Sequence, residues 1–251
     1  MISSFYVERD SFLHSLDPRV KLVASFLGIV AMILFNSPYA LLPLFLFILL
    51  SLRFLGKIGF REQWQVLKPL VPLMIITMIV WPFILKPPLF GLFFGFGYAL
   101  RLGALGLITF SLLLTTKQRD LILGFIKLKM PYEIGLTLTI ALRYIPTLYT
   151  LTMTIMDAQK SRGLELERGN FFTRVRKTIP VLIPLIISSI KTAHELSIAL
   201  ESRAFGTKKK RTFLHDIKME LRDYISLTVI LGLFIAAAVL RYKYGVGYVR
   251  I

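Results

Sequence analysis

The stretch AQKSRGLE, residues 158–165, recurs in altered form as ALESRAFG, residues 199–206. Both copies contain Ala-x-x-Ser-Arg followed by a small residue, and 41 positions separate Arg162 from Arg203. Gly163 suits the left-handed position just past a helix C-terminus, and arginine in the last turn complements the helix dipole. The repeat therefore predicts two similar helical arms that end in the same way.

Apolar side chains recur at spacings of three and four in each arm, which is the pattern of one helix face. The first arm, residues 132–162, presents Leu136, Ile140, Tyr144, Leu148, Leu151 and Ile155. The second arm, from about residue 179 to residue 203, presents Leu182, Ile186, Ser189, Ala193, Leu196 and Leu200. A basic connector over residues 163–178 joins the arms, and Pro146, Pro180 and Pro184 are expected to permit bends.

The rest of the chain is strongly apolar. Hydrophobic residues make up 55% of the 251 positions, against roughly 45–50% in soluble domains, which indicates an integral membrane protein. Five runs approach the ~20 apolar residues that a membrane span needs. They cover residues 20–35, 39–55, 67–85, 98–116 and 224–240. The predicted fold is all-α, with about five transmembrane helices and two long amphipathic arms on the cytoplasmic side.

The charge distribution predicts how the chain is oriented in the cell membrane. Lys and Arg total 31 against 14 Asp and Glu, a net charge of +17. Cations fill the link between the second and third runs and follow the fourth, whereas the links at residues 36–38 and 87–97 carry no charge. Because basic links stay inside, the N-terminus is expected in the cytoplasm and the uncharged links outside. No nucleic-acid recognition module accompanies the charge, so nucleic acid is not an expected partner.

The arms themselves are not expected to cross the membrane. A first arm that crossed would export the cations Lys160, Arg162, Arg168, Arg174, Arg176 and Lys177, against the positive-inside rule. Lys191 and Glu195 of the second arm would also enter hydrocarbon, which is unfavourable for each charge. Three regions result: a four-span bundle over residues 1–117, an arm region over 118–223, and a final span with its tail over 224–251.

Two interpretations of the Ser-Arg-small ends remain open. A helix cap predicts an end signal, but it does not require arginine at both equivalent positions. A docking site would use arginine as an always-charged, bidentate donor to an acidic groove of a cytoplasmic protein, with a small residue that permits close approach. The docking residues would be Ser161, Arg162, Gly163, Ser202, Arg203 and Ala204.

The paired ends, together with DSFLHSLDPRVKL at residues 10–22, resemble the transmembrane T component of energy-coupling factor transporters. This group includes the cobalt and biotin permease subunits, and the resemblance covers nearly the whole chain. The family's usual motif is Ala-Arg-Gly. Serine therefore replaces alanine in both copies here, and Ala204 replaces glycine in the second.

The resemblance implies a subunit that bridges two ABC-type ATPases and a membrane S component, which captures a vitamin or a metal ion. The arms would be the family's coupling helices, with Arg162 on one ATPase and Arg203 on the other. ATP-driven motion of the ATPases would move the arms, and the apolar faces of the arms would pass that motion to the S component. Substrate choice would then reside in the S component.

The chain lacks the residues for chemistry of its own. No GxxxxGK[ST] loop for ATP phosphates is present, and His14, His194 and His215 are scattered, so we predict no catalysis and no bound metal or cofactor. A self-contained secondary transporter is the alternative, and it normally needs ionisable residues inside its spans. Arg101 lies near the outer end of the fourth run, where we expect its side chain to extend toward the interface. The run KKKR at residues 208–211 suits anionic lipid headgroups and a solvated surface equally.

Overall fold

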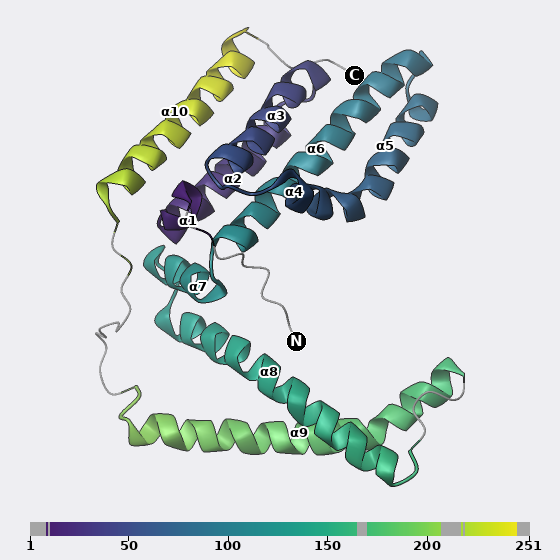
Figure 1. Cartoon of the computed structure of the whole chain (residues 1–251), viewed down its shortest axis with the longest axis vertical. Helices are drawn as coiled ribbons and strands as arrows, with labels where there is room; N and C mark the ends of the chain where they lie inside the picture. Colours follow the sequence, from purple (N-terminus) through teal and green to yellow (C-terminus); the bar gives the residue numbers. More distant parts are fainter. Residues whose placement is uncertain (1–8, 10, 165–169, 207–216, 218, 245–251) are drawn as a thin grey trace. The chain divides into compact units, whose positions relative to one another are not determined.

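The computed structural model describes residues 9, 11–164, 170–206, 217 and 219–244. Within these ranges the chain is helical and has no β-strand, which confirms the all-α prediction. The helices are α1 (Phe12–Ser15), α2 (Pro18–Leu34), α3 (Pro38–Phe54), α4 (Phe60–Leu67), α5 (Val71–Ile84), α6 (Pro88–Thr115), α7 (Gln118–Lys127), α8 (Tyr132–Ser161), α9 (Phe171–Ser202) and α10 (Leu221–Tyr244). Two compact units divide the chain (Figure 1): the bundle, Ser3–Pro131 with Ile217–Ile251, and the arm pair, Tyr132–Asp216.

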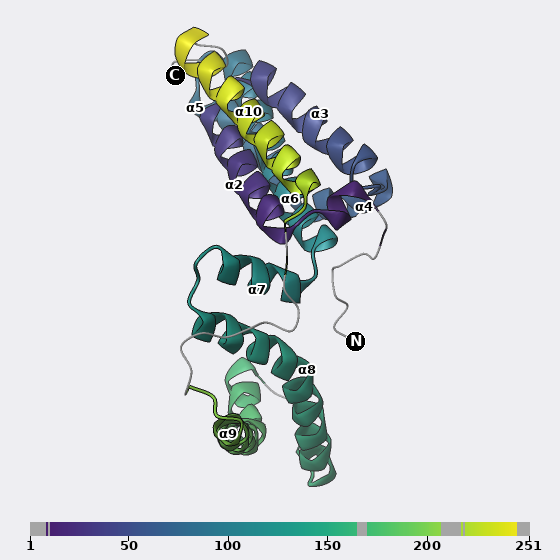
Figure 2. The same cartoon turned by 90° about the vertical axis from the view of Figure 1, so that its left-hand side faces the viewer.

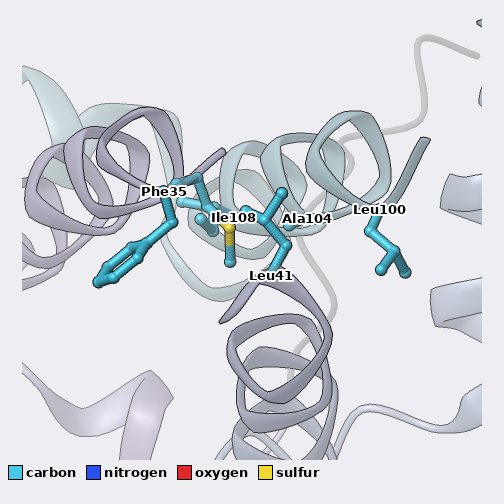
Figure 3. Packing of buried hydrophobic residues seen from close by; sticks show 6 residues of the cluster. Phe35, Leu41, Leu100, Ala104 and Ile108 are labelled. Atoms are coloured by element: carbon cyan, nitrogen blue, oxygen red, sulfur yellow. The ribbon is translucent and has the colours of Figure 1, made fainter. Parts of the chain in front are cut away.

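Helix α6 is the centre of the bundle and contacts α2, α3, α4 and α5 (Figure 2). Ala104 and Ile108 of α6 pack with Leu41 of α3 in the first core cluster (Figure 3). That cluster also contains Met32, Phe35 and Leu100. A second cluster joins Leu52, Ile58, Val66 and Leu67 to Leu107 of α6. Lipid tails are as apolar as these side chains, so the hydrophobic effect does not drive such helices together in a membrane. Close van der Waals packing stabilises the bundle instead.

The link from α5 to α6 is shorter than the glycine-rich outer stretch predicted over residues 87–97. Helix α6 begins at Pro88, so Gly91 and Gly95 are helical, and both lie against α5. A Cβ on Gly91 would lie 2.5 Å from Pro82 Cα, and one on Gly95 would lie 3.1 Å from Met78 Cα. The glycines are therefore small-residue contacts between two membrane-type helices, in which the backbones approach closely.

Arg101 is half-buried and reaches the residues that end α2, next to the predicted outer link, so its extension toward the interface stays a prediction. Its guanidinium donates hydrogen bonds to Phe35 O and, at 2.9 Å, to Asn36 Oδ1, where α2 ends. The same group lies 4.9 Å from the centroid of the Tyr98 ring, a cation–π contact. Arg101 thus supplies donors to acceptors at a helix end. These contacts give the ionisable side chain of Arg101 a structural role.

Five helical stretches of the described residues are long and apolar enough to cross a membrane, as expected of a multi-pass membrane protein. They are Phe60–Ile84, Pro88–Thr115, Tyr132–Ser161, Phe172–Ser202 and Leu221–Lys243. Two of these five are the arms, whereas the predicted spans α2 and α3 have only 17 residues each. A 17-residue helix measures about 26 Å, close to the ~30 Å of the hydrocarbon core. Length and composition therefore do not distinguish the arms from the spans.

Candidate functional site

The arm pair consists of α8 and α9, which cross each other (Figure 1). Helix α8 has the bounds predicted for the first arm to within one residue. Helix α9 begins at Phe171, earlier than the predicted residue 179, because the end of the basic connector is helical. In Figure 1 α9 bends in its first half, where Pro180 and Pro184 each remove a backbone donor.

The predicted stripe of α8 faces inward over its whole length, whereas that of α9 does so only in part. In α8 all six residues of the predicted stripe are partly buried. In α9 the predicted Leu182, Ile186 and Ala193 are exposed. The predicted Ser189, Leu196 and Leu200 are partly buried, and the inner face of α9 also includes Val181, Leu185, Ser188 and Thr192. Half of the predicted stripe of α9 therefore lies on the outside of the arm pair.

Gln159 fixes the crossing of the two arms with a hydrogen bond. Its side-chain Nε2 donates to Pro180 O of α9 at 3.2 Å. In an uninterrupted helix that carbonyl would accept from the amide four residues later, but residue 184 is a proline and has no N–H. The glutamine of α8 thus satisfies an acceptor that Pro184 leaves open, and the adjacent Val181 is buried.

The first arm ends in a Schellman motif, in which two backbone amides close the last turn. Gly163 N donates to Lys160 O at 2.9 Å, and Leu164 N donates to Gln159 O at 3.0 Å. Gly163 has a φ of +87°, the left-handed conformation that the motif requires. A Cβ at Gly163 would meet no atom within 4 Å, so this conformation, and not crowding inside the chain, is the local reason for glycine.

The second arm ends in the same motif, in the same register. Ala204 N donates to Glu201 O at 2.8 Å, and Phe205 N donates to Leu200 O at 3.0 Å. Ala204 occupies the left-handed position with a φ of +57°. An alanine there is about 1 kcal/mol less favourable than a glycine. Arg162 and Arg203 are therefore equivalent residues, each the C-cap of its arm.

Neither arginine side chain takes part in its cap, because the Schellman bonds join backbone groups only. Both arginines are exposed, and within the described residues neither side chain forms a hydrogen bond or an ion pair. The hydroxyls of Ser161 and Ser202 donate back to their own helices, to Asp157 O and Ala199 O, each at 3.0 Å. Capping thus explains Gly163 but not Ala204, and it gives the arginines only a helix-dipole contribution of about 0.5 kcal/mol each.

Each arm end contacts the other arm. Gln159, which fixes the crossing, also accepts the last backbone bond of the first arm. At the second end the ring of Phe205 lies 6.5 Å from the ring of Tyr132, the first residue of α8. The two C-terminal ends lie at opposite ends of the arm pair (Figure 1). We call Ser161–Gly163 and Ser202–Ala204 the two tips.

Leu164 and Phe205 complete the tips and were not predicted as tip residues, although the sequence contains a signal for them. An apolar residue directly after the left-handed position is typical of the Schellman motif, and Leu164 and Phe205 both follow this pattern.

The histidines do not form a cluster. His14 lies within hydrogen-bond distance of Ser11 Oγ at 2.6 Å, and His194 is exposed on α9. His215 and the KKKR run lie outside the described residues. No group of three His, Asp or Glu side chains suited to a metal occurs in the part of the chain that the structure describes.

Comparison with known proteins agrees with this architecture. The family of cobalt transport proteins (CbiQ) matches residues 9–213. The energy-coupling factor transporter transmembrane protein EcfT of Clostridium kluyveri is 37% identical over 242 residues, which cover 88% of this chain and 89% of the relative. EcfT of Staphylococcus aureus is 36% identical, with 97% and 98% covered, and EcfT of Bacillus subtilis is 34% identical, with 96% and 97% covered. The chain therefore belongs to the CbiQ family and is an energy-coupling transmembrane protein of the EcfT type.

Proposed function

We propose that the two tips dock this chain onto two ABC-type ATPases, and that the arm pair couples those ATPases to a substrate-binding S component in the membrane. The chain would thus be the non-catalytic bridge of an ATP-driven importer for a vitamin or a metal ion. The observation that carries the proposal is the pair of identical Schellman ends, each with an exposed arginine that the cap does not use.

The geometry of the tips suits two similar acidic grooves. Both arginines occupy the same position in the same backbone motif. Each side chain therefore leaves its helix from an equivalent backbone position. A guanidinium can donate two parallel hydrogen bonds to one carboxylate, and the small residue after it lets a partner approach the helix end. The two tips lie at opposite ends of the arm pair, so each ATPase of a pair can receive one tip.

The charge of the arm pair supports its placement at the cytoplasmic surface. The start of α9 contains Arg174, Arg176 and Lys177, and its first turn has no acidic residue. Lys191, His194 and Glu195 are exposed along the same helix. If the arms crossed the bilayer, these side chains would face lipid or be exported, which is unfavourable for both topology and insertion. The N-terminus would lie on the same, cytoplasmic side.

Exposed apolar surface on both arms supports contact with a second membrane protein. The outer side of α8 exposes Ile134, Leu138, Ile145, Tyr149 and Met153, each by at least 41%. Helix α9 exposes Ile179, Leu182, Ile183, Ile186, Ile187 and Ile190, by 44–65%. Such contiguous apolar surface is unfavourable in water and indicates contact with lipid or with another protein. We assign it to the S component and to the edge of the bilayer.

The arm crossing suggests how motion is transmitted. When ATP binding changes the separation of the two ATPases, the two tips would move with them. Gln159 and the buried Val181 hold the arms together near the crossing, so a change in tip separation would rotate one arm relative to the other. The exposed apolar faces would rotate as well, and this would change the surface offered to the S component.

Co-purification tests the docking step. We expect the tagged wild-type chain to retain its ATPase pair in detergent, and the variant Arg162→Glu/Arg203→Glu to lose at least ~90% of it, because two charge-pair contacts become repulsive. The matched control is Lys160→Glu/Arg176→Glu, which makes the same change in charge at two other exposed arm positions and should retain the ATPases. Equal retention by wild type and tip variant would return the arginines to a capping role.

A further inference from the structure

The first turn of α2 lies at a buried polar site that the function proposed above does not use. Asp17 precedes α2, and its Oδ1 accepts from Arg19 N at 2.8 Å, which caps the helix. Asp223, in the first turn of α10, accepts from Asp17 N through Oδ1 and from Glu220 N through Oδ2, both at 2.8 Å. Both carboxylates are 4% exposed. One buried carboxylate thus joins two chain segments that are 206 residues apart.

Two cations complete the site. Lys21, 7% exposed, donates from Nζ to Thr115 O at 2.9 Å, at the end of α6, and to His14 O at 3.1 Å. Arg19 donates from Nη2 to Ile217 O at 3.1 Å. We call Asp17, Arg19, Lys21 and Asp223 the α2 anchor. Buried charges are unfavourable unless they are paired, and their hydrogen bonds hold a specific geometry.

Helix α7 also lies against this turn, through a glycine. A Cβ on Gly124 would lie 3.2 Å from Pro18 Cβ and 3.4 Å from Leu22 Cδ1. These distances are short, so α7 approaches the start of α2 more closely than a larger residue would allow. The same turn of α2 therefore contacts the end of α6, helix α7 and the segment that precedes α10.

These contacts fall at both connections between the bundle and the arm pair. The chain leaves the bundle after Pro131 and returns to it at Ile217. The outgoing connection passes through α7, which packs on α2, and the incoming one is bonded at Ile217 and Asp223. We propose that the α2 anchor is the fixed point through which the arm pair acts on the bundle. The proposal rests on the coupling function above and makes Asp223 and Arg19 positioning residues for it.

A released anchor should uncouple transport from ATP hydrolysis. We would reconstitute the complete complex in vesicles and measure ATP hydrolysis together with uptake of a radiolabelled vitamin that the co-reconstituted S component binds. Asparagine at position 223 offers one acceptor oxygen for two backbone donors, so Asp223→Asn should lower uptake per ATP by about tenfold while hydrolysis stays within about twofold of wild type. Arg19→Met removes the bond to Ile217 O and the 3.8 Å ion pair with Asp17 Oδ1, and it should lower that ratio by about threefold.

The control is Arg222→Met, which changes an exposed arginine next to Asp223 and should leave the ratio unchanged. If Asp223→Asn does not assemble, Arg19→Met decides alone, because it preserves both bonds of Asp223. An unchanged ratio in every assembled variant, or equal losses of uptake and hydrolysis, would overturn the anchor. Failure of the wild-type chain to retain ATPases would overturn the proposed function itself, an outcome distinct from an unchanged ratio.

Discussion

Replacing Arg162 and Arg203 together by alanine is expected to reduce substrate uptake at least ~100-fold in cells that express the complete transporter. Each substitution would remove a charge-assisted contact and leave the partner carboxylate buried and unpaired. This would weaken binding by about 2–5 kcal/mol for each tip. Folding should be unaffected, because both side chains are exposed and the helix caps at the tips are formed by backbone groups. The measurement is uptake by intact cells, normalised to the amount of the chain in the membrane.

Lysine substitutions separate charge from geometry at the tips. Arg162→Lys/Arg203→Lys keeps the charge but not the bidentate donor, so uptake should fall to an intermediate level.

The single alanine variants should differ, because Ala204 makes the second tip about 1 kcal/mol less favourable than a glycine would. Normal uptake by a well-expressed double alanine variant would contradict docking through the arginines.

The second large effect is expected at the contact between α5 and α6. In Gly91→Leu the new side chain would begin 2.5 Å from Pro82 Cα and 2.6 Å from Trp81 O, which are backbone atoms that cannot rotate away. The helices would have to separate, at about 3 kcal/mol or more. We therefore expect the detergent-solubilised chain to unfold roughly 10 °C lower than wild type.

Gly232 provides the matched control in α10. A Cβ at this position would meet no atom within 4 Å, so Gly232→Leu should change the unfolding temperature by no more than about 2 °C. Thermal unfolding of both variants followed by intrinsic fluorescence makes the comparison. Equal unfolding temperatures for Gly91→Leu and wild type would mean that α5 and α6 do not pack through their glycines.

The ends of the arms could be predicted from sequence because their signals are local. A left-handed residue followed by an apolar one specifies a Schellman motif within six residues, and Gly163 and Ala204 each stand at that position. The face of α8 was also predictable, because polar residues separate its apolar ones. Residues 179–187 of α9 are apolar on nearly every side, so periodicity could not identify the buried face.

Contacts between distant segments could not be predicted in the same way. The partners of Arg101 could not be predicted, because Phe35 O and Asn36 Oδ1 belong to the end of another helix. Residues 87–97 were predicted as an uncharged link, whereas Gly91 and Gly95 are helical and permit close packing between two membrane-type helices. Asp223 gave no sequence signal, because its main partner is the backbone of Asp17.

The most direct test of the docking claim uses thiols placed at the tips. The chain has no cysteine, so Ser161→Cys and Ser202→Cys would each carry a single thiol at equivalent positions and leave both arginines in place. With a short thiol–amine cross-linker in inside-out vesicles, we predict that each variant is joined to an ATPase, and that Thr150→Cys, exposed in the middle of α8, is not. If neither tip is joined to an ATPase while the complex remains assembled, the tips do not dock, and the coupling mechanism proposed here is wrong.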